Sequence, residues 1–285
     1  MKHTGRISLV GVGPGPFSLL TGQAIETILN SNVVFMDGYT SVYLQSENDD
    51  FFKWAEEKNI QIKIASRPLL EQPENWMKEY RNQQICVIVL GDPMLSTTHS
   101  SLVLLAEEFG YFVNIIHGLG VNTLIGSIGL QSTKFGRIVS IVYPYRDIIL
   151  TSPLEHLAFN YWQGLHTLVL LDLDPTGEGV DKPIPMTPLI ARDSLIKMNQ
   201  KLTLNDIDSP ISLANNASVT NWLEISIDER DVILCSDLGS SDEKIYFCKL
   251  KHLQNISLGT IHCLIFPSNL TQIEKQMISR LDKFP

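Results

Sequence analysis

Glycine and aspartate recur where short apolar stretches of this sequence end. Three glycines alternate in the segment VGVGPGP near the N-terminus, and the segments GDP at 91–93 and HGLG at 117–120 follow two later apolar stretches. Glycine lets a backbone turn sharply and approach a ligand closely. A strand that ends in such a turn and feeds a helix commonly presents a nucleotide-like ligand to main-chain groups. These turns are therefore candidate binding elements.

The spacing of the first turn separates it from the dinucleotide fingerprint. That fingerprint has glycines at its first, third and sixth positions, and the sixth position here is Pro16. Taken alone, the segment fits a ligand turn and a plain strand-to-helix turn equally well.

The second turn, GDPMLSTTHS, is the most specific of the set. Asp92 could accept hydrogen bonds from a ribose or an ammonium group, or it could bond the backbone of its own turn. Thr97 and Thr98 could cap a helix. His99 could carry a proton, although a buried histidine with satisfied hydrogen bonds is the favoured interpretation.

Other chemistries find little support. The four cysteines, Cys86, Cys235, Cys248 and Cys263, form no CxxC pair, so no zinc or disulfide framework is indicated. No two histidines have ligand spacing with a carboxylate nearby, and no GxSxG segment marks a serine hydrolase.

Apolar stretches alternating with helical patterns predict an α/β fold whose first half has a mainly parallel sheet. Thr21 is a plausible N-cap for a helix over 21–30, and a second helix is expected from about residue 97 to 109. The expected strands of this half are 7–12, 33–37, 60–65, 85–90 and 111–116.

The pattern changes after residue 117, which predicts an N-terminal domain over 1–117 and a C-terminal domain over 118–285. Strands follow one another more closely in the second half, which favours a mixed sheet. Helices are expected at 121–130, 153–163 and 270–282, and a mobile insert at 208–219. The expected strands are 137–143, 166–172, 231–235, 244–250 and 261–266.

Composition narrows the class of protein. The 285 residues are 44% apolar and 19% charged, as in a globular protein, and the net charge is −9. Basic residues are scattered, so we expect neither nucleic-acid nor membrane-surface binding. The N-terminus lacks a signal-peptide pattern and no stretch approaches the roughly 20 apolar residues of a membrane helix. We expect a cytoplasmic protein.

Several segments, taken in order, resemble one family. The opening VGVGPGPFSLLTGQA resembles the Gly-rich turn of the tetrapyrrole-methylase-like methyltransferases, and the segments VLGDPMLSTTHS, GLQSTKFG and GLHTL narrow the resemblance to the diphthine synthases. The resemblance covers 7–45 and 85–173 well and returns weakly at 231–240 and 259–267. It implies a two-domain tetrapyrrole-methylase-like fold, with a cofactor cleft between the domains, and a homodimer.

The resemblance also implies a reaction and a set of cofactor contacts. A diphthine synthase transfers methyl groups from S-adenosylmethionine, leaving S-adenosylhomocysteine, to the 3-amino-3-carboxypropyl group on a histidine of elongation factor 2. Three methyl groups go to the amine, and eukaryotic members also methylate the carboxylate. Motif by motif, the cofactor contacts carry over to Pro14, Asp92, Leu95, Gly120, Val121, Leu171, Cys235 and His262.

Some segments depart from the family pattern, mainly on the side that faces the acceptor. They are Asp37-Gly38 before Tyr-Thr-Ser, Ser101 in place of an aspartate, DIILTSPLEH after the strand expected at 137–143, and CSDLGS at 235–240 in place of a turn with an arginine. No general base is assigned, but Asp37, Tyr39 and His99 are candidates. The alternatives are a methylase of a porphyrin-like macrocycle and a weakly catalytic relative that binds the elongation factor.

Overall fold

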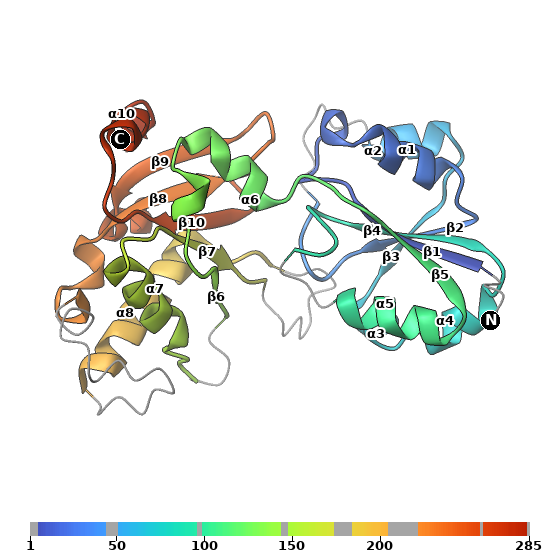
Figure 1. Cartoon of the computed structure of the whole chain (residues 1–285), viewed down its shortest axis with the longest axis horizontal. Helices are drawn as coiled ribbons and strands as arrows, with labels where there is room; N and C mark the ends of the chain where they lie inside the picture. The colour runs from blue at the N-terminus through green and yellow to red at the C-terminus, as the bar shows by residue number, and fades with distance from the viewer. Residues whose placement is uncertain are drawn as a thin grey trace. The chain divides into compact units, whose positions relative to one another are not determined.

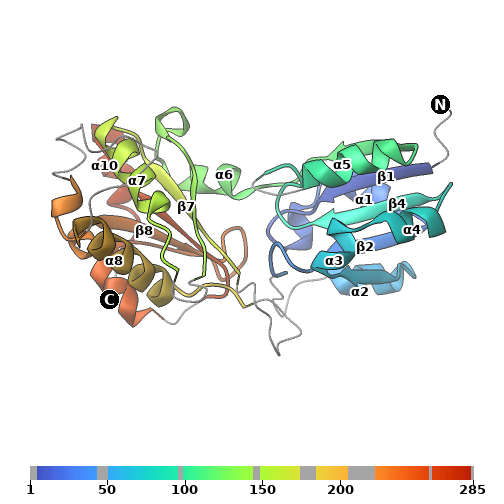
Figure 2. The same ribbon diagram turned by 90° about the horizontal axis from the view of Figure 1, so that it is seen from below.

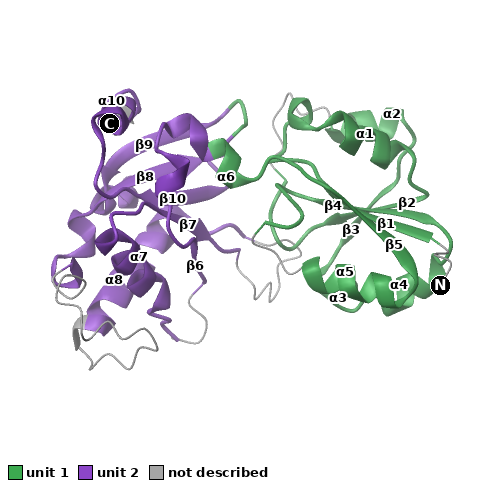
Figure 3. Cartoon of the chain, in the orientation of Figure 1, with its two compact units in different colours: residues 1–124, 177–183, 239–241 green, residues 125–176, 184–238, 242–285 purple. Residues whose placement is uncertain are grey.

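The computed structural model describes residues 5–43, 51–95, 99–143, 148–173, 184–204, 222–256 and 259–283. Contacts divide the chain into two compact units, coloured separately in Figure 3. The first contains the described residues of Met1–Leu124 together with Gly239–Ser241, and the second contains most of the remainder. The predicted domain boundary after residue 117 lies a few residues before this division and stays a prediction.

The first unit is built on a parallel sheet with strand order β3-β2-β4-β1-β5. β1 lies between β4 and β5, so the turns that follow these three strands leave the same edge of the sheet. All five strands lie within two residues of their predicted positions. Their bounds are Gly5–Gly11 (β1), Val33–Asp37 (β2), Ile62–Ala65 (β3), Gln84–Val89 (β4) and Tyr111–Ile116 (β5).

Helices cover both faces of this sheet (Figure 1). Side chains of α1 (Gly22–Leu29) and α2 (Phe51–Glu57) pack on one face, with Ala24, Ile28 and Phe51 in the core. The other face is covered by α3 (Arg67–Glu71), α4 (Glu74–Glu79) and α5 (His99–Glu108). The Thr21 side chain accepts a hydrogen bond from the Ala24 amide, which confirms the predicted N-cap.

The second unit has a mixed six-stranded sheet with strand order β11-β9-β8-β10-β7-β6. β10 is antiparallel to both of its neighbours, β7 and β8, whereas β6 and β7 are parallel. The predicted mixed sheet is therefore confirmed. The strands are Val139–Ile141 (β6), Thr167–Leu171 (β7), Asp231–Ser236 (β8), Lys244–Lys249 (β9), His262–Phe266 (β10) and Asp282–Lys283 (β11).

Two contacting helices, α7 (Ser152–Trp162) and α8 (Pro188–Leu204), pack their apolar side chains on one face of this sheet (Figure 2). α10 (Gln272–Ile278) lies between β10 and β11 in the chain. One predicted helix is wrong: residues 121–130 form the single turn α6 (Val121–Leu124) and a 3-10 turn over Ile125–Ile128. Gly129 then has a φ of +85°, which a continuing α-helix does not permit.

All of the predicted mobile insert at 208–219 lies outside the described residues. No helix in the described part of the chain has both the length and the apolar character needed to cross a membrane.

A buried carboxylate connects distant segments of the second unit. The Glu274 side chain, fully buried, accepts hydrogen bonds from Lys134 Nζ at 2.7 Å and His166 Nε2 at 3.0 Å. The backbone amides of Gln131 and Thr271 also donate to it. Since Ser268 N donates to His166 Nδ1, the proton of the neutral imidazole is on Nε2, facing Glu274. Burial alone would raise the pKa of Glu274, but these hydrogen bonds hold it far below its usual value.

We predict that Glu274→Gln destabilises the protein by about 3 kcal/mol, because it leaves Lys134 without its buried partner. The folded pKa of Glu274 lies below the unfolded value of 4.5. Its ionised carboxylate therefore stabilises the native protein above that pH, and the contribution is lost as the pH falls below it. Urea denaturation from pH 7 to pH 3 should show a steeper acid loss in the parent than in the variant. Glu229→Gln, which removes an exposed ion pair with Lys251, should leave the stability nearly unchanged because solvent screens such a pair. Equal effects of the two substitutions would contradict the account.

Candidate functional site

Three glycines let the turns after β1, β4 and β5 touch backbone to backbone. A Cβ placed on Gly11 would lie 2.5 Å from the Gly118 amide nitrogen and 2.7 Å from the Gly91 carbonyl oxygen. A Cβ on Gly118 would overlap the same carbonyl and the backbone of Gly11. Gly13 and Gly91 exchange two main-chain hydrogen bonds, of 3.2 and 2.7 Å, and both have φ above +70°. Side chains are thus excluded from the point where the three turns meet.

Asp92 joins the second and third of these turns. Its Oδ2 lies 2.8 Å from His117 Nδ1 and accepts a hydrogen bond from the Gly118 amide at 3.3 Å. Its Oδ1 accepts a hydrogen bond from the Met94 amide, so the carboxylate also bonds the backbone of its own turn. One of the two interpretations of Asp92 is therefore confirmed, and its binding role stays a prediction.

Four of the predicted cofactor residues of the first unit lie close to one another. A Cβ on Gly120 would be 2.5 Å from Leu95 Cδ2 and 3.6 Å from Asp92 Cβ, and Val121 begins α6 directly afterwards. Pro14 directly follows Gly13, whose main chain is bonded to Gly91 next to Asp92. Asp92, Leu95 and Val121 are each partly exposed, whereas Gly120 is buried.

The remaining predicted cofactor residues lie at neighbouring strand ends of the second sheet. β7 and β8 end where the antiparallel β10 begins, so Leu171, Cys235 and His262 belong to three neighbouring strand ends. His262 is paired with Ser236, and their side chains are 2.8 Å apart between Nδ1 and Oγ. Burial lowers the pKa of His262 against the opposing charge of Asp237, which favours a neutral imidazole.

The side chain of Cys235 and those of His262 and Ser236 lie on different faces of the sheet. Its register partner is Cys263, and successive side chains of a strand alternate between faces. Its thiol therefore lies on the face opposite to the side chains of His262 and Ser236. The contact with Cys263, together with burial, raises the pKa of Cys235 and keeps it a neutral, apolar thiol.

The candidate bases Asp37 and His99 form a buried pair in the first unit. His99 Nε2 lies 3.2 Å from Asp37 Oδ2, and His99 Nδ1 lies 3.2 Å from the Pro93 carbonyl oxygen. Burial would raise the pKa of Asp37, but His99, the Thr40 hydroxyl and two backbone amides together lower it. Both side chains are almost fully buried, which confirms the favoured interpretation of His99 and indicates that the pair anchors the turn after β2.

Metal chemistry finds no support in the part of the chain that the structure describes. No group of three or more His, Cys, Asp or Glu side chains there could hold an ion. The site elements are instead main-chain turns with a few apolar and polar side chains.

Comparisons with known proteins agree with this arrangement. A model of the Tetrapyrrole (Corrin/Porphyrin) Methylases family matches residues 6–254. A diphthine synthase of Sulfurisphaera tokodaii is 31% identical over 270 residues, which cover 92% of this chain and 93% of the relative. The chain belongs to the diphthine synthase family. It is accordingly an S-adenosylmethionine-dependent methyltransferase, as the sequence motifs predicted.

Two further relatives extend the comparison. An Arabidopsis thaliana protein named "probable diphthine methyl ester synthase" is 28% identical, with 95% of this chain and 96% of the relative covered. A solved structure named diphthine synthase superposes with a TM-score of 0.77 at 22% identity, covering 98% of this chain and 96% of that one. The superposition confirms the predicted fold class, and the predicted cleft between domains stays a prediction.

Two of the motifs that pointed to diphthine synthase turn out to be structural. Lys134 of GLQSTKFG and His166 of GLHTL are the partners of buried Glu274, not residues of either predicted cluster. Sequence analysis did not single out Ser236, which pairs with His262, or Gly118, which packs against Gly11. The only sequence signal for Ser236 is its place at a strand end, whereas Gly118 belongs to the HGLG turn already noted.

Gly118→Ala should destabilise the protein by about 1–3 kcal/mol, the usual cost of overpacking, because its Cβ meets backbone atoms that cannot turn away. The matched control is Gly22→Ala, since a Cβ on Gly22 has no atom within 4 Å. Thermal denaturation of both variants would decide the matter, and a Gly118→Ala protein as stable as the control would contradict the packing described.

Proposed function

We propose that this methyltransferase acts on the 3-amino-3-carboxypropyl group on a histidine of elongation factor 2, in the pathway to diphthamide. It would place three methyl groups on the amine and a further one on the carboxylate. The observation that carries the proposal is the similarity to diphthine synthases over 92% of the chain. The ester step has additional support from the printed name of the Arabidopsis relative.

We further propose that S-adenosylmethionine is held by the two clusters of predicted residues: Pro14, Asp92, Leu95, Gly120 and Val121 from the first unit, and Leu171, Cys235 and His262 from the second. The residues fit the cofactor chemically. The glycine turns place no side chains in the way of a nucleoside, the Asp92 carboxylate suits hydroxyl or ammonium groups, and the Leu171 side chain suits an adenine ring, with Cys235 contributing its main chain because its thiol lies on the opposite face of the sheet.

When bound, S-adenosylmethionine supplies an electrophilic methyl group on a sulfonium. The chain then has to align the acceptor in line with that methyl group and exclude water. An amine acceptor must lose one proton before each of its methylations, whereas a carboxylate oxygen can accept the methyl group directly. Turns fixed by main-chain contacts suit the aligning role because little freedom is left to lose.

No described residue is proposed as the base for the amine. Asp37 and His99 are buried against one another, so we assign them a structural role. An acceptor carried by elongation factor 2 implies a cytoplasmic enzyme, and the family resemblance favours a homodimer.

The direct test is transfer of a radiolabelled methyl group to elongation factor 2 that carries the 3-amino-3-carboxypropyl histidine, with mass spectrometry counting the added groups. We expect up to four added methyl groups, the fourth of them sensitive to mild alkaline hydrolysis as an ester should be. Elongation factor without the modification is the matched control. Labelling of a porphyrin-like acceptor in place of the elongation factor would overturn the proposed substrate while leaving the methyltransferase assignment intact.

Gly120→Val tests the cofactor cluster without breaking the fold. Its new side chain meets the flexible end of Leu95 at 2.5 Å, so Leu95 is expected to move instead of the backbone. We predict about ten-fold weaker binding of S-adenosylhomocysteine by calorimetry, equivalent to about 1.4 kcal/mol, with a nearly unchanged melting temperature. Gly126→Ala is the control, because a Cβ there meets nothing within 4 Å. Unchanged affinity in a folded Gly120→Val protein would remove Gly120 and Leu95 from the proposed site.

A further inference from the structure

A cavity of about 290 Å³ lies within the second unit and has no part in the proposed methyl transfer. Phe266, at the end of β10, and Asp231, at the start of β8, line it. The predicted cofactor residue His262 is at the opposite end of β10, four residues away, which corresponds to about 13 Å along a strand. The cavity and the predicted cofactor residues of this unit therefore lie at opposite ends of the strands.

Positive charges outnumber negative charges around the cavity. Asp231 is paired with Lys249 at 2.8 Å, and Glu229 is paired with Lys251 at 2.9 Å. Arg230 and Lys275 also line the cavity, but neither forms an ion pair with a carboxylate among the described residues. The local balance thus leaves two positive charges that an anion could neutralise.

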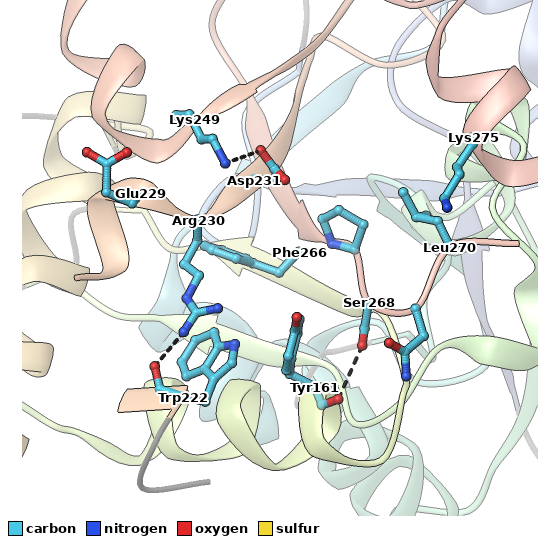
Figure 4. A pocket seen from close by; sticks show the side chains of 12 residues that line it. Tyr161, Trp222, Glu229, Arg230, Asp231, Lys249, Phe266, Ser268, Leu270 and Lys275 are labelled. Atoms are coloured by element: carbon cyan, nitrogen blue, oxygen red, sulfur yellow. Dashed lines mark hydrogen bonds and ion pairs between the residues drawn. The ribbon is translucent and has the colours of Figure 1, made fainter. Parts of the chain in front are cut away.

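Two hydrogen-bond donors at the cavity have no acceptor in the described structure. The Arg230 guanidinium lies over the Trp222 ring, 4.3 Å from its centroid, and its Nη2 donates to the Trp222 carbonyl oxygen at 2.6 Å (Figure 4). Arg230 Nε and Trp222 Nε1 are both buried without a partner, and Trp222 is only 5% exposed. A buried donor without an acceptor costs about 1–3 kcal/mol, so these two N–H groups favour a ligand that supplies acceptors.

The rest of the lining is suited to an apolar body. Tyr161 lies beside the stacked pair, with its ring centroid 5.6 Å from that of Trp222 and 5.6 Å from the Arg230 guanidinium carbon. Phe266 and Leu270 supply further apolar wall. Burial lowers the pKa of Arg230, against the raising effects of Tyr161 and Asp231, and a bound anion would offset that cost of burial.

We propose that this cavity binds a carboxylate carried on a flat apolar group, with Arg230 and Trp222 as donors to its two oxygens and Lys275 as a further cation. A planar carboxylate matches two orphan donors and the edge of a guanidinium, whereas a phosphate presents three oxygens to satisfy. The size of the cavity is near the lower end of small-ligand sites. The ligand could be a free aromatic acid or the C-terminal residue of a peptide, which share this chemistry.

The indole N–H signal of Trp222 offers a direct readout. The chain has four tryptophans, so protein labelled with ¹⁵N-tryptophan gives few indole signals, and Trp222→Phe assigns the relevant one. We expect N-acetylphenylalanine to shift that signal saturably, and its uncharged isostere N-acetylphenylalaninamide to leave it unmoved. Comparison of 3-phenylpropionate with N-acetyl-Gly-Gly-Phe then separates a free acid from a peptide terminus as the better ligand, and saturable binding of either supports the proposal.

Variants of the cations complete the test. Arg230→Gln should weaken binding of N-acetylphenylalanine at least ten-fold, and Lys275→Gln should weaken it several-fold. Lys63→Gln, which removes an exposed cation of the first unit that does not line the cavity, should leave it unchanged. If Arg230→Gln fails to fold, Lys275→Gln still tests the role of the cations, because Lys275 is exposed and its substitution should not disturb folding. Equal shifts with acid and amide, tighter binding of phenyl phosphate, or equal effects of Lys275→Gln and Lys63→Gln would overturn the proposal, whatever the outcome of the methyl-transfer assay.

Discussion

The close approach of three backbone turns in the first unit is the constraint on which the candidate site depends. A Cβ on Gly11 or Gly118 would collide with main-chain atoms of the neighbouring turns, and Gly91 has a φ of +73°, which side chains rarely adopt. This contact fixes the ends of the three adjacent strands β4, β1 and β5 relative to one another, and Asp92 adds hydrogen bonds across two of the turns. The three turns are thus held in place by main-chain contacts, without side chains at the point where they meet.

In the second unit, a buried charged residue connects segments that are distant in the sequence. Glu274 takes hydrogen bonds from segments more than a hundred residues away, through Lys134 and His166. Its full burial means that each partner has to be in place, because an unpaired carboxylate there would be very costly. The sheet edge with Leu171, Cys235 and His262 is instead set by strand register, since the antiparallel β10 brings three strand ends together.

Local patterns predicted much of this arrangement. Apolar stretches fix the strands, and the alternation of strands and helices distinguishes the parallel from the mixed sheet. The helix expected at 121–130 is wrong, because the chain changes from α-helix to a 3-10 turn after Leu124 and Gly129 then has a positive φ. The partners of Glu274 and the orphan donors of Arg230 and Trp222 depend on contacts between distant segments, which residue spacing does not reveal. The face used by Cys235 follows from its pairing with Cys263, which is known only once the register is known.

Hydrogen exchange with and without S-adenosylhomocysteine tests the proposal that residues of both clusters contact the cofactor. The account predicts slower amide exchange at 91–95 and 117–121 in the first unit and at 235–238 and 259–262 in the second. The amides around Arg230 and Lys275 should be unaffected. Protection confined to one of the two units, or found instead around the Arg230 cavity, would contradict the account.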